Sequence, residues 1–181
     1  MVQTDEALYT AYHEGDLSAF DCLYDRYKRP LYRFLLRRGL PQDAVEDVFH
    51  ESWLSVISFE KKQHFKVGGF KAWIYTVSRN KSIDAFRKAN IHTEENWDEH
   101  INEVFSEITT EQQQVDIDCL ALMKESIAQL PFDQRDAFLL QQEAGLSLQQ
   151  IAEMMKVGRE TIKSRLRYAM NQLKTWLEEC L

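Results

Sequence analysis

Basic and aromatic residues are interleaved between Lys61 and Lys88 in a pattern that suits binding of single-stranded nucleic acid. This window holds eight Lys and Arg residues and one acidic residue, Asp84. Trp73 and Tyr75 offer flat rings on which unpaired bases stack, and the cations suit a phosphate backbone. The same rings also suit a hydrophobic core, so from the residues alone both interpretations stay open.

A second basic window, from Lys156 to Arg167, lies within a helix-turn-helix pattern. It holds five Lys and Arg residues against Glu160. Apolar residues recur at helical spacing on both sides of a short turn at 156–158, and Ser147 is placed to cap the first helix. Spacing alone fits any small helical bundle. The charges favour DNA, because four side chains avoid the apolar side of the second helix and suit a major groove: Arg159, Lys163, Ser164 and Arg167.

The formal net charge of −7 is unevenly divided along the 181 residues. Residues 1–90 have a balance of +2, residues 91–119 a balance of −9 without any Lys or Arg, and residues 120–181 a balance of 0. The acidic stretch has few aromatic residues and too much charge to support a core. It is predicted to be a mobile tether between two blocks that are free to be locally basic.

Helices are expected through most of the chain, because apolar residues recur at helical spacing and no segment alternates convincingly at period two. Ser18, followed by Asp21, resembles a capping box at the start of the first long helix. Pro41 opens the next helix, which has one apolar face and one acidic face.

Glycines 68 and 69 interrupt the basic window, after which the pattern predicts a third helix over 70–77 and a short fourth helix over 83–86. The pattern resumes at residue 117, ends before Pro131 and restarts at Phe132. The predicted fold is therefore all-α, with two small helical domains at 1–90 and 120–181 joined by a flexible acidic linker at 91–119.

Several functional classes are poorly supported by the sequence. No apolar run is long enough for a membrane span, and the first residues carry no secretion pattern. The three cysteines are far apart and lack C-x-x-C spacing, so they are expected to be reduced thiols. His50-Glu51 lacks the second histidine of H-E-x-x-H, and no nucleophile or phosphate loop is recognisable. We expect no metal, no cofactor and no enzymatic activity.

Together, these segments resemble the bacterial extracytoplasmic-function (ECF) sigma factors of RNA polymerase over nearly the whole chain. The resemblance is carried by DLSAFDCLYDRYKRPLYRFLLR, DAVEDVFHESWLSV, FKAWIYTVSRNKSIDAFRK and LPFDQRDAFLLQQEAGLSLQQIAEMMKVGRETIKSRLRYAMNQLK. It implies a first domain, sigma region 2, that binds core polymerase and the melted minus-ten element. It implies a second domain, region 4, that binds the minus-thirty-five element as duplex.

The resemblance also implies three sets of site residues. The core-polymerase set is an acidic helix face, which without the family is most simply a solvated surface: Asp43, Glu46, Asp47, His50 and Glu51. The minus-ten set includes a loop at 78–82 that holds a flipped base, although Asn80 could equally punctuate a turn: Lys71, Trp73, Tyr75, Arg79, Asn80, Lys81, Ser82 and Arg87. The minus-thirty-five set lies on the last helix: Arg159, Glu160, Lys163, Ser164, Arg167 and Tyr168.

Two positions depart from the family pattern. His50 stands where a glutamine is usual, and the last helix has Arg167 before Tyr168 where an aromatic residue often precedes a basic one. The expected partners are core polymerase, through its beta-prime clamp and beta flap, promoter DNA and an anti-sigma factor, with no membrane insertion and a cytoplasmic location. A stand-alone helix-turn-helix repressor and a helical adaptor are the alternatives, and the repressor leaves the aromatic basic window unexplained.

Overall fold

The computed structural model describes residues 3–58, 65, 69–89 and 121–178, and every statement about the structure refers to these residues. All regular elements among them are helices, as expected: α1 (Asp5–His13), α2 (Leu17–Arg37), α3 (Gln42–Ser58), α4 (Gly69–Lys88), α6 (Phe132–Gln142), α7 (Leu148–Met155) and α8 (Arg159–Leu177). Residues 121–129 are also helical. The predicted linker at 91–119 lies outside the described residues.

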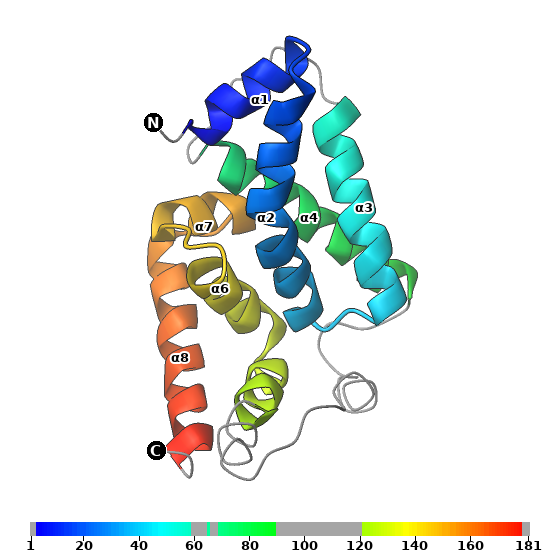
Figure 1. Cartoon of the computed structure of the whole chain (residues 1–181). Helices are drawn as coiled ribbons and strands as arrows, with labels where there is room; N and C mark the ends of the chain where they lie inside the picture. Colours follow the sequence, from blue (N-terminus) through cyan, green and yellow to red (C-terminus); the bar gives the residue numbers. More distant parts are fainter. Residues whose placement is uncertain (1–2, 59–64, 66–68, 90–120, 179–181) are drawn as a thin grey trace, which may run out of the picture.

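Helices α1 to α4 form an N-terminal bundle in which α3 and α4 pack on each other and on α2 (Figure 1). Apolar residues of α2 at the predicted helical spacing point inward and are fully buried, among them Leu23, Leu31 and Phe34. Phe70 and Ile74 of α4 meet them from the other side of the core. Burial of such side chains contributes about 1.5–3 kcal/mol each, so this stripe supplies much of the bundle's stability.

The C-terminal bundle is built from residues 121–130 with α6, α7 and α8, where α8 packs on both α6 and α7 (Figure 1). Leu139 and Leu140 of α6 are fully buried, as are Ile151 of α7 and Ile162 of α8. The two bundles touch through α2 and α6. The described residues therefore form two helical bundles that pack against each other, and the buried apolar residues of both belong to one hydrophobic cluster.

The capping of α2 differs from the sequence prediction. Asp16, not Ser18, is the N-cap residue, and its carboxylate accepts hydrogen bonds from the backbone N–H of Ser18 at 3.0 Å and from its Oγ at 2.6 Å. The hydrogen bond from the Ser18 side chain is the main reason that the pKa of Asp16 is lowered. The helix starts earlier than predicted because the carboxylate of Asp16, two residues before Ser18, caps the backbone N–H of Ser18.

The predicted break between a third and a fourth helix is wrong, because α4 continues without interruption through residues 78–82. Asn80, which suggested a turn, lies within the helix, and the two serines that flank it are also accommodated there. Ser78 Oγ donates to the carbonyl of Ile74 at 2.9 Å, and Ser82 Oγ donates to the carbonyl of Arg79 at 2.7 Å. Serine side chains that bond back to carbonyls three or four residues earlier are satisfied without ending the helix.

The start of α4 is fixed by a carboxylate from α1. The backbone N–H of Phe70 donates to Glu6 Oε1 at 3.0 Å, which places a negative charge at a helix N-terminus. Gly69 has φ +68°, and a Cβ built on it would lie 2.0 Å from the same Glu6 oxygen. The backbone angle thus favours a glycine here, and a larger residue would also displace the Glu6 carboxylate from the start of α4.

The predicted helix-turn-helix is confirmed as α7 and α8. Ser147 caps α7 in a full capping box, since its Oγ accepts from Gln150 N at 3.3 Å and the Gln150 side chain accepts from Ser147 N at 2.8 Å. The turn is made by Lys156 in the left-handed conformation, with φ 56° and ψ 41°. The capping box fixes the start of α7, and the turn at Lys156 sets the direction in which the chain continues into α8.

Replacing Ser147 with alanine should lower the free energy of unfolding by about 1 kcal/mol, because α7 loses its N-cap side chain. Urea denaturation followed by circular dichroism measures the change. Ser18→Ala is the matched control and should cost clearly less, since Asp16 still caps α2. An equal loss in both variants would contradict the capping assignment.

Candidate functional site

The second helix of the helix-turn-helix presents a charged, exposed face. Arg159, Lys163 and Arg167 are exposed on α8, whereas Ile162 and Leu166 on the opposite side are buried. The predicted minus-thirty-five residues therefore share one accessible surface, with Glu160 and Tyr168 also exposed and Ser164 half-buried. Side chains at the start of such a helix are positioned to enter a DNA major groove.

Two local contacts organise this α8 face. Lys163 Nζ lies 2.7 Å from Glu160 Oε1, and this hydrogen bond is the main reason that the pKa of Glu160 is lowered. The guanidinium of Arg167 lies 5.3 Å from the centre of the Tyr168 ring. Both pairs are exposed and weak, so the cations can exchange these partners for phosphates or base edges at little cost.

The acidic face predicted on α3 is exposed along its whole length. Asp43, Glu46, Asp47, His50 and Glu51 all point to solvent, while Val45, Val48, Phe49 and Trp53 face the core. Glu51 forms an exposed ion pair with Lys81 of α4 at 3.3 Å. None of the other three carboxylates is ion-paired to a described residue, which leaves an acidic surface able to accept a basic partner.

The predicted minus-ten residues on α4 fall into three groups. Asn80 and Arg87 are exposed, and Lys71, Trp73 and Lys81 are half-buried. The third group is buried: Tyr75, Arg79 and Ser82. Because α4 is one helix, Asn80 lies on an exposed helix surface, so neither the predicted base-holding loop nor the alternative turn is present there.

Burial excludes Tyr75 from base stacking in this conformation. Its ring is 1% exposed and packs edge-to-face against Phe34 at 5.2 Å between ring centres. Burial also raises the pKa of Tyr75 to about 12. Trp73 is half-buried against the rings of Tyr9, Phe65 and Phe70, so it packs on the hydrophobic core but remains partly accessible. The period of the aromatic pattern predicted the helix but not which rings stay accessible.

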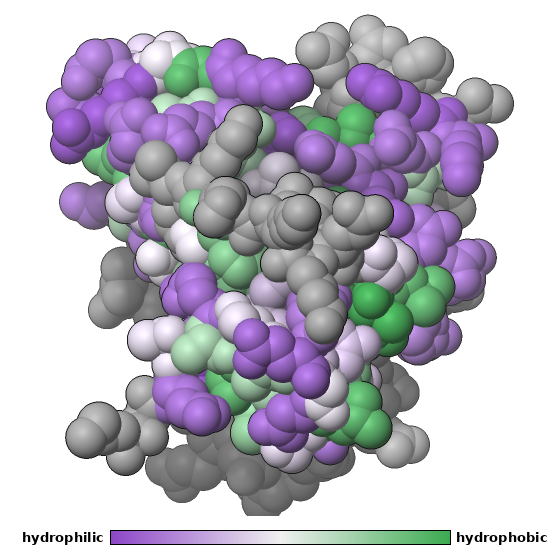
Figure 2. Space-filling model, turned by 90° about the horizontal axis from the view of Figure 1, so that it is seen from above, coloured by the Kyte–Doolittle hydropathy of each residue, from purple (hydrophilic) through white to green (hydrophobic). Residues whose placement is uncertain are grey.

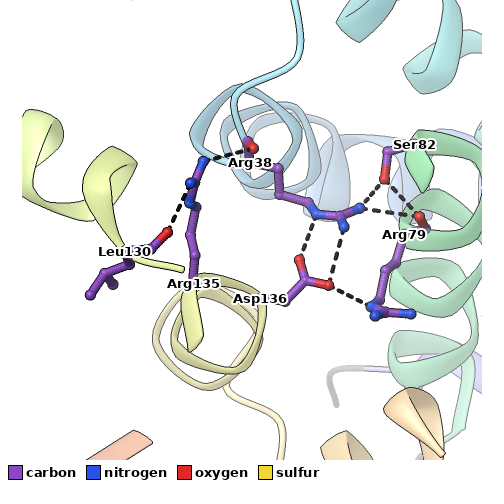
Figure 3. A network of polar contacts seen from close by, with 6 residues as sticks. All are labelled: Arg38, Arg79, Ser82, Leu130, Arg135 and Asp136. Carbon is purple, nitrogen blue, oxygen red and sulfur yellow. Dashed lines mark hydrogen bonds and ion pairs between the residues drawn. The ribbon is translucent and has the colours of Figure 1, made fainter. Parts of the chain in front are cut away.

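Arg79 and Ser82 belong to a buried polar network between the two bundles (Figure 3). Its centre is Asp136 of α6, whose Oδ2 accepts from Arg79 Nε at 2.7 Å and from Arg38 Nη2 at 3.1 Å. Arg38 Nε lies 2.6 Å from the other carboxylate oxygen, an ion pair in which the N–H is poorly aligned for a hydrogen bond. Asp136 is 1% exposed and Arg38 is 0% exposed.

Further contacts complete this network. Arg38 Nη1 donates to the carbonyl of Arg79 at 3.1 Å and to Ser82 Oγ. Arg135 donates to the carbonyl of Arg38 at 3.1 Å and to the carbonyl of Leu130 at 2.9 Å. Burial lowers the pKa of Arg38, with Asp136 opposing the shift, and burial lowers the pKa of Arg135 to about 10.

The inter-bundle ion pairs and hydrogen bonds of Arg38, Arg135, Asp136 and Glu143 were not predicted from the sequence. Glu143, at the end of α6, pairs with Arg33 at 2.6 Å and also with Arg37, both of α2. The ion pairs of Asp136 and Glu143 join residues that are 57 to 110 positions apart in the chain. Spacing within one helix carries no information about such contacts, because they depend on how the two bundles pack.

The end of the molecule that carries α1 is mostly hydrophilic, with scattered apolar patches (Figure 2). Within the described residues, no group of three or more His, Cys, Asp or Glu side chains could hold a metal ion. No helix among them is both long and apolar enough to cross a lipid bilayer.

Comparison with known proteins identifies both bundles. Residues 23–91 match the family model "Sigma-70 region 2", and residues 126–175 match "Sigma-70, region 4". Two solved structures are similar along nearly the whole chain. CnrH in complex with the cytosolic domain of CnrY has a TM-score of 0.63 at 20% identity, over 97% of each chain. The sigma factor RpoE in complex with the anti-sigma factor NepR from Bartonella quintana has a TM-score of 0.64 at 26% identity, over 90% of this chain and 98% of that one.

Curated relatives agree with this assignment. The ECF sigma factor SigL of Mycobacterium tuberculosis is 31% identical over 87% of this chain and 88% of its own length. The ECF sigma-E factor of Haemophilus influenzae is 26% identical over 97% and 96% of the two chains. With both regions matched in order on one chain, the protein belongs to the ECF family of RNA polymerase sigma factors.

Proposed function

We propose that this ECF sigma factor directs core polymerase to its promoters through three separate surfaces. The α3 acidic face (Asp43, Glu46, Asp47, His50 and Glu51) binds the beta-prime clamp. The exposed part of α4 contacts the melted minus-ten element, and the α8 face (Arg159, Glu160, Lys163, Ser164, Arg167 and Tyr168) reads the minus-thirty-five duplex, with region 4 held by the beta flap. The chain itself contributes specificity, and the chemistry of RNA synthesis belongs to the core enzyme.

One observation carries this proposal: a region 2 and a region 4 occur in order on a single chain, each with an exposed charged face of the sign its partner requires. Acidic α3 suits basic polymerase residues, and basic α8 suits DNA phosphates. A repressor would need no acidic docking face. A helical adaptor would need no cations at the start of a recognition helix.

The proposed minus-ten contacts are those that α4 leaves accessible. Asn80 can both donate and accept hydrogen bonds, so it can read the edge of a base once that base is unstacked. Lys81 and Arg87 lie near it on the helix and suit the backbone of the displaced strand. Trp73 exposes part of its ring, whereas Tyr75 is left out of this set because it is buried.

An anti-sigma factor is a further proposed partner. The RpoE neighbour was solved with its anti-sigma factor NepR, and its likeness to this chain covers both regions. A protein that works on core polymerase must reach it in the cytoplasm, so we place its action there.

Asp43→Lys combined with Asp47→Lys should weaken binding to core polymerase by at least about tenfold, because charge reversal on the α3 face repels a basic docking surface. The fold should be unaffected, since exposed substitutions change stability by about 0.5 kcal/mol or less. Pull-down with core polymerase and a promoter gel shift measure the loss.

Asp21→Lys with Asp25→Lys is the matched control, because these carboxylates have the same spacing on exposed positions of α2. It should bind core polymerase like the parent chain. If both double variants keep parental binding, α3 is merely a solvated face. If the parent chain binds a palindromic operator tightly without polymerase, the sigma-factor proposal fails and the repressor alternative stands.

Lys163→Ala and Arg167→Ala should each weaken recruitment of the holoenzyme to duplex promoter DNA, because each lost base-edge contact costs about 1–3 kcal/mol. Gel-shift titrations on promoters with single substitutions in the upstream element also report any relaxed specificity. Lys174→Ala removes the same charge near the end of α8 and should have a much smaller effect. Equal losses for Lys163→Ala and Lys174→Ala would indicate a general charge effect instead of groove reading.

Asn80→Ala should leave closed-complex binding nearly normal and reduce open-complex formation, because a contact to a flipped base contributes only after melting. Permanganate reactivity of unpaired thymines reports the melted state. Binding to a pre-melted promoter shows whether minus-ten preference is relaxed. Asn171→Ala, the same substitution at an exposed position of α8, is the control. Parental melting and selection by Asn80→Ala would rule out the base-reading role.

A further inference from the structure

One residue of the α3 acidic face can change its charge near neutral pH. His50 is exposed, with Glu46 and Asp47 one helical turn before it and Glu51 directly after it. Histidine is the side chain that ordinarily gains or loses a proton between about pH 5 and pH 8, a range in which most carboxylates stay ionised. The net charge of this face therefore follows the protonation of His50.

The packing of His50 lets its ring change protonation without disturbing the core. The centre of its ring lies 5.9 Å from that of Phe49, at an interplanar angle of 66°. Phe49 is buried and packs edge-to-face against Tyr32 of α2 at 5.5 Å between ring centres. The imidazole thus lies beside an aromatic side chain of the bundle while the residue stays exposed to solvent. Changes at exposed positions usually alter stability little, so protonation acts on what the face binds.

Helix α4 approaches the α3 acidic face with a cation, Lys81, whose Nζ lies 3.3 Å from Glu51 Oε2. Further along α4, Arg87 lies 3.3 Å from Asp84 and pairs within its own helix. The charge of Glu51 is therefore already balanced by a cation of region 2. The free negative charge of the face comes from its other carboxylates.

Charged side chains of α2, which also packs on α3, balance one another. Lys28 Nζ lies 2.5 Å from Asp25 Oδ1 and 5.5 Å from the centre of the Tyr24 ring. Asp21 and Arg29 are exposed on the same helix and are opposite in charge. These two cations and two carboxylates cancel, so they add no net charge beside the α3 acidic face.

Protonation of His50 removes a large part of the free charge of this face. Its three remaining carboxylates are ion-paired to no described residue, so the free charge is −3 while His50 is neutral and −2 once it is protonated. Glu46 and Asp47 also lie four and three residues before His50, the spacings at which opposite charges on a helix attract. An imidazolium here therefore competes with a basic partner for the same carboxylates.

We propose that His50 makes the docking of this chain on core polymerase dependent on pH, so that the α3 acidic face binds a basic surface tightly when His50 is neutral and weakly when it is protonated. This proposal rests on the proposed function, because it concerns the same docking face. A partner that prefers the neutral imidazole displaces its proton on binding. By linkage, affinity for that partner falls as the pH falls through the range in which His50 gains a proton.

His50→Gln, made in the full chain, tests the proposal, because glutamine keeps hydrogen-bonding groups at this position and stays neutral at every pH. The dissociation constant for core polymerase is measured by fluorescence anisotropy of the labelled chain at about pH 7.5 and about pH 6, on either side of the ordinary histidine range. Acidification should weaken binding of the parent chain about fivefold more than binding of His50→Gln. Comparing the two chains cancels any titration of groups on the polymerase.

His50→Lys is the second variant, since it fixes a positive charge at the same position. At about pH 7.5 it should bind as weakly as the parent chain does at about pH 6, and its affinity should change little more than that of His50→Gln between the two. His13→Gln is the matched control, because it removes a histidine of α1 that packs on Tyr9 and Tyr12 instead of lying on α3. It should keep the parental pH response. Circular dichroism at both pH values checks the fold.

Salt provides an independent check of the electrostatic cause. Raising the salt concentration to about 1 M shortens the screening length to about 3 Å, so the difference between the parent chain and His50→Gln should shrink. A difference that stays the same in high salt would overturn the proposal. A parental pH response in His50→Gln would overturn it as well, as would parental affinity of His50→Lys at about pH 7.5.

The same titrations separate this proposal from the proposed function. Tight binding of the parent chain to core polymerase with no pH response beyond that of His50→Gln would overturn the role of His50 and leave docking through α3 standing. Absence of binding by the parent chain at either pH would reject the proposed function, and the role of His50 with it.

Discussion

The packing of the two regions depends on one buried carboxylate. Asp136 lies between Arg38 and Arg79, and all three are withdrawn from water. Removing a charged group from water costs several kcal/mol, about as much as a good ion pair returns, so this contact specifies the arrangement more than it stabilises it. The neighbouring Phe86 and Phe132 rings pack edge-to-face at 5.7 Å, and the guanidinium of Arg38 lies against both of them. The packing of α6 on α2 and α4 therefore depends on the contacts that Asp136 makes with Arg38 and Arg79.

Much of the fold was predictable because its signals are local. The capping box at Ser147, the turn at 156–158 and the two-faced α3 are each encoded within a few residues. The errors arose where a local signal had two solutions. Asn80 can punctuate a turn or lie on the surface of a helix, and α4 continues through it. Ser78 and Ser82 bond back to earlier carbonyls of the same helix. At the start of α2, the N-cap residue is Asp16 instead of the predicted Ser18.

The candidate site residues also differ in whether local sequence signals could predict their exposure. The α3 and α8 faces were predictable because a helical period separates apolar from polar positions, and the polar side is exposed as expected. The burial of Tyr75, Arg79 and Ser82 was not predictable, because it depends on partners such as Phe34 and Asp136 that are far away in the sequence. A basic residue in a charged stretch of sequence is normally expected to be exposed to solvent. Arg79 is buried instead, because α6 packs on α2 and α4 and places Asp136 beside it.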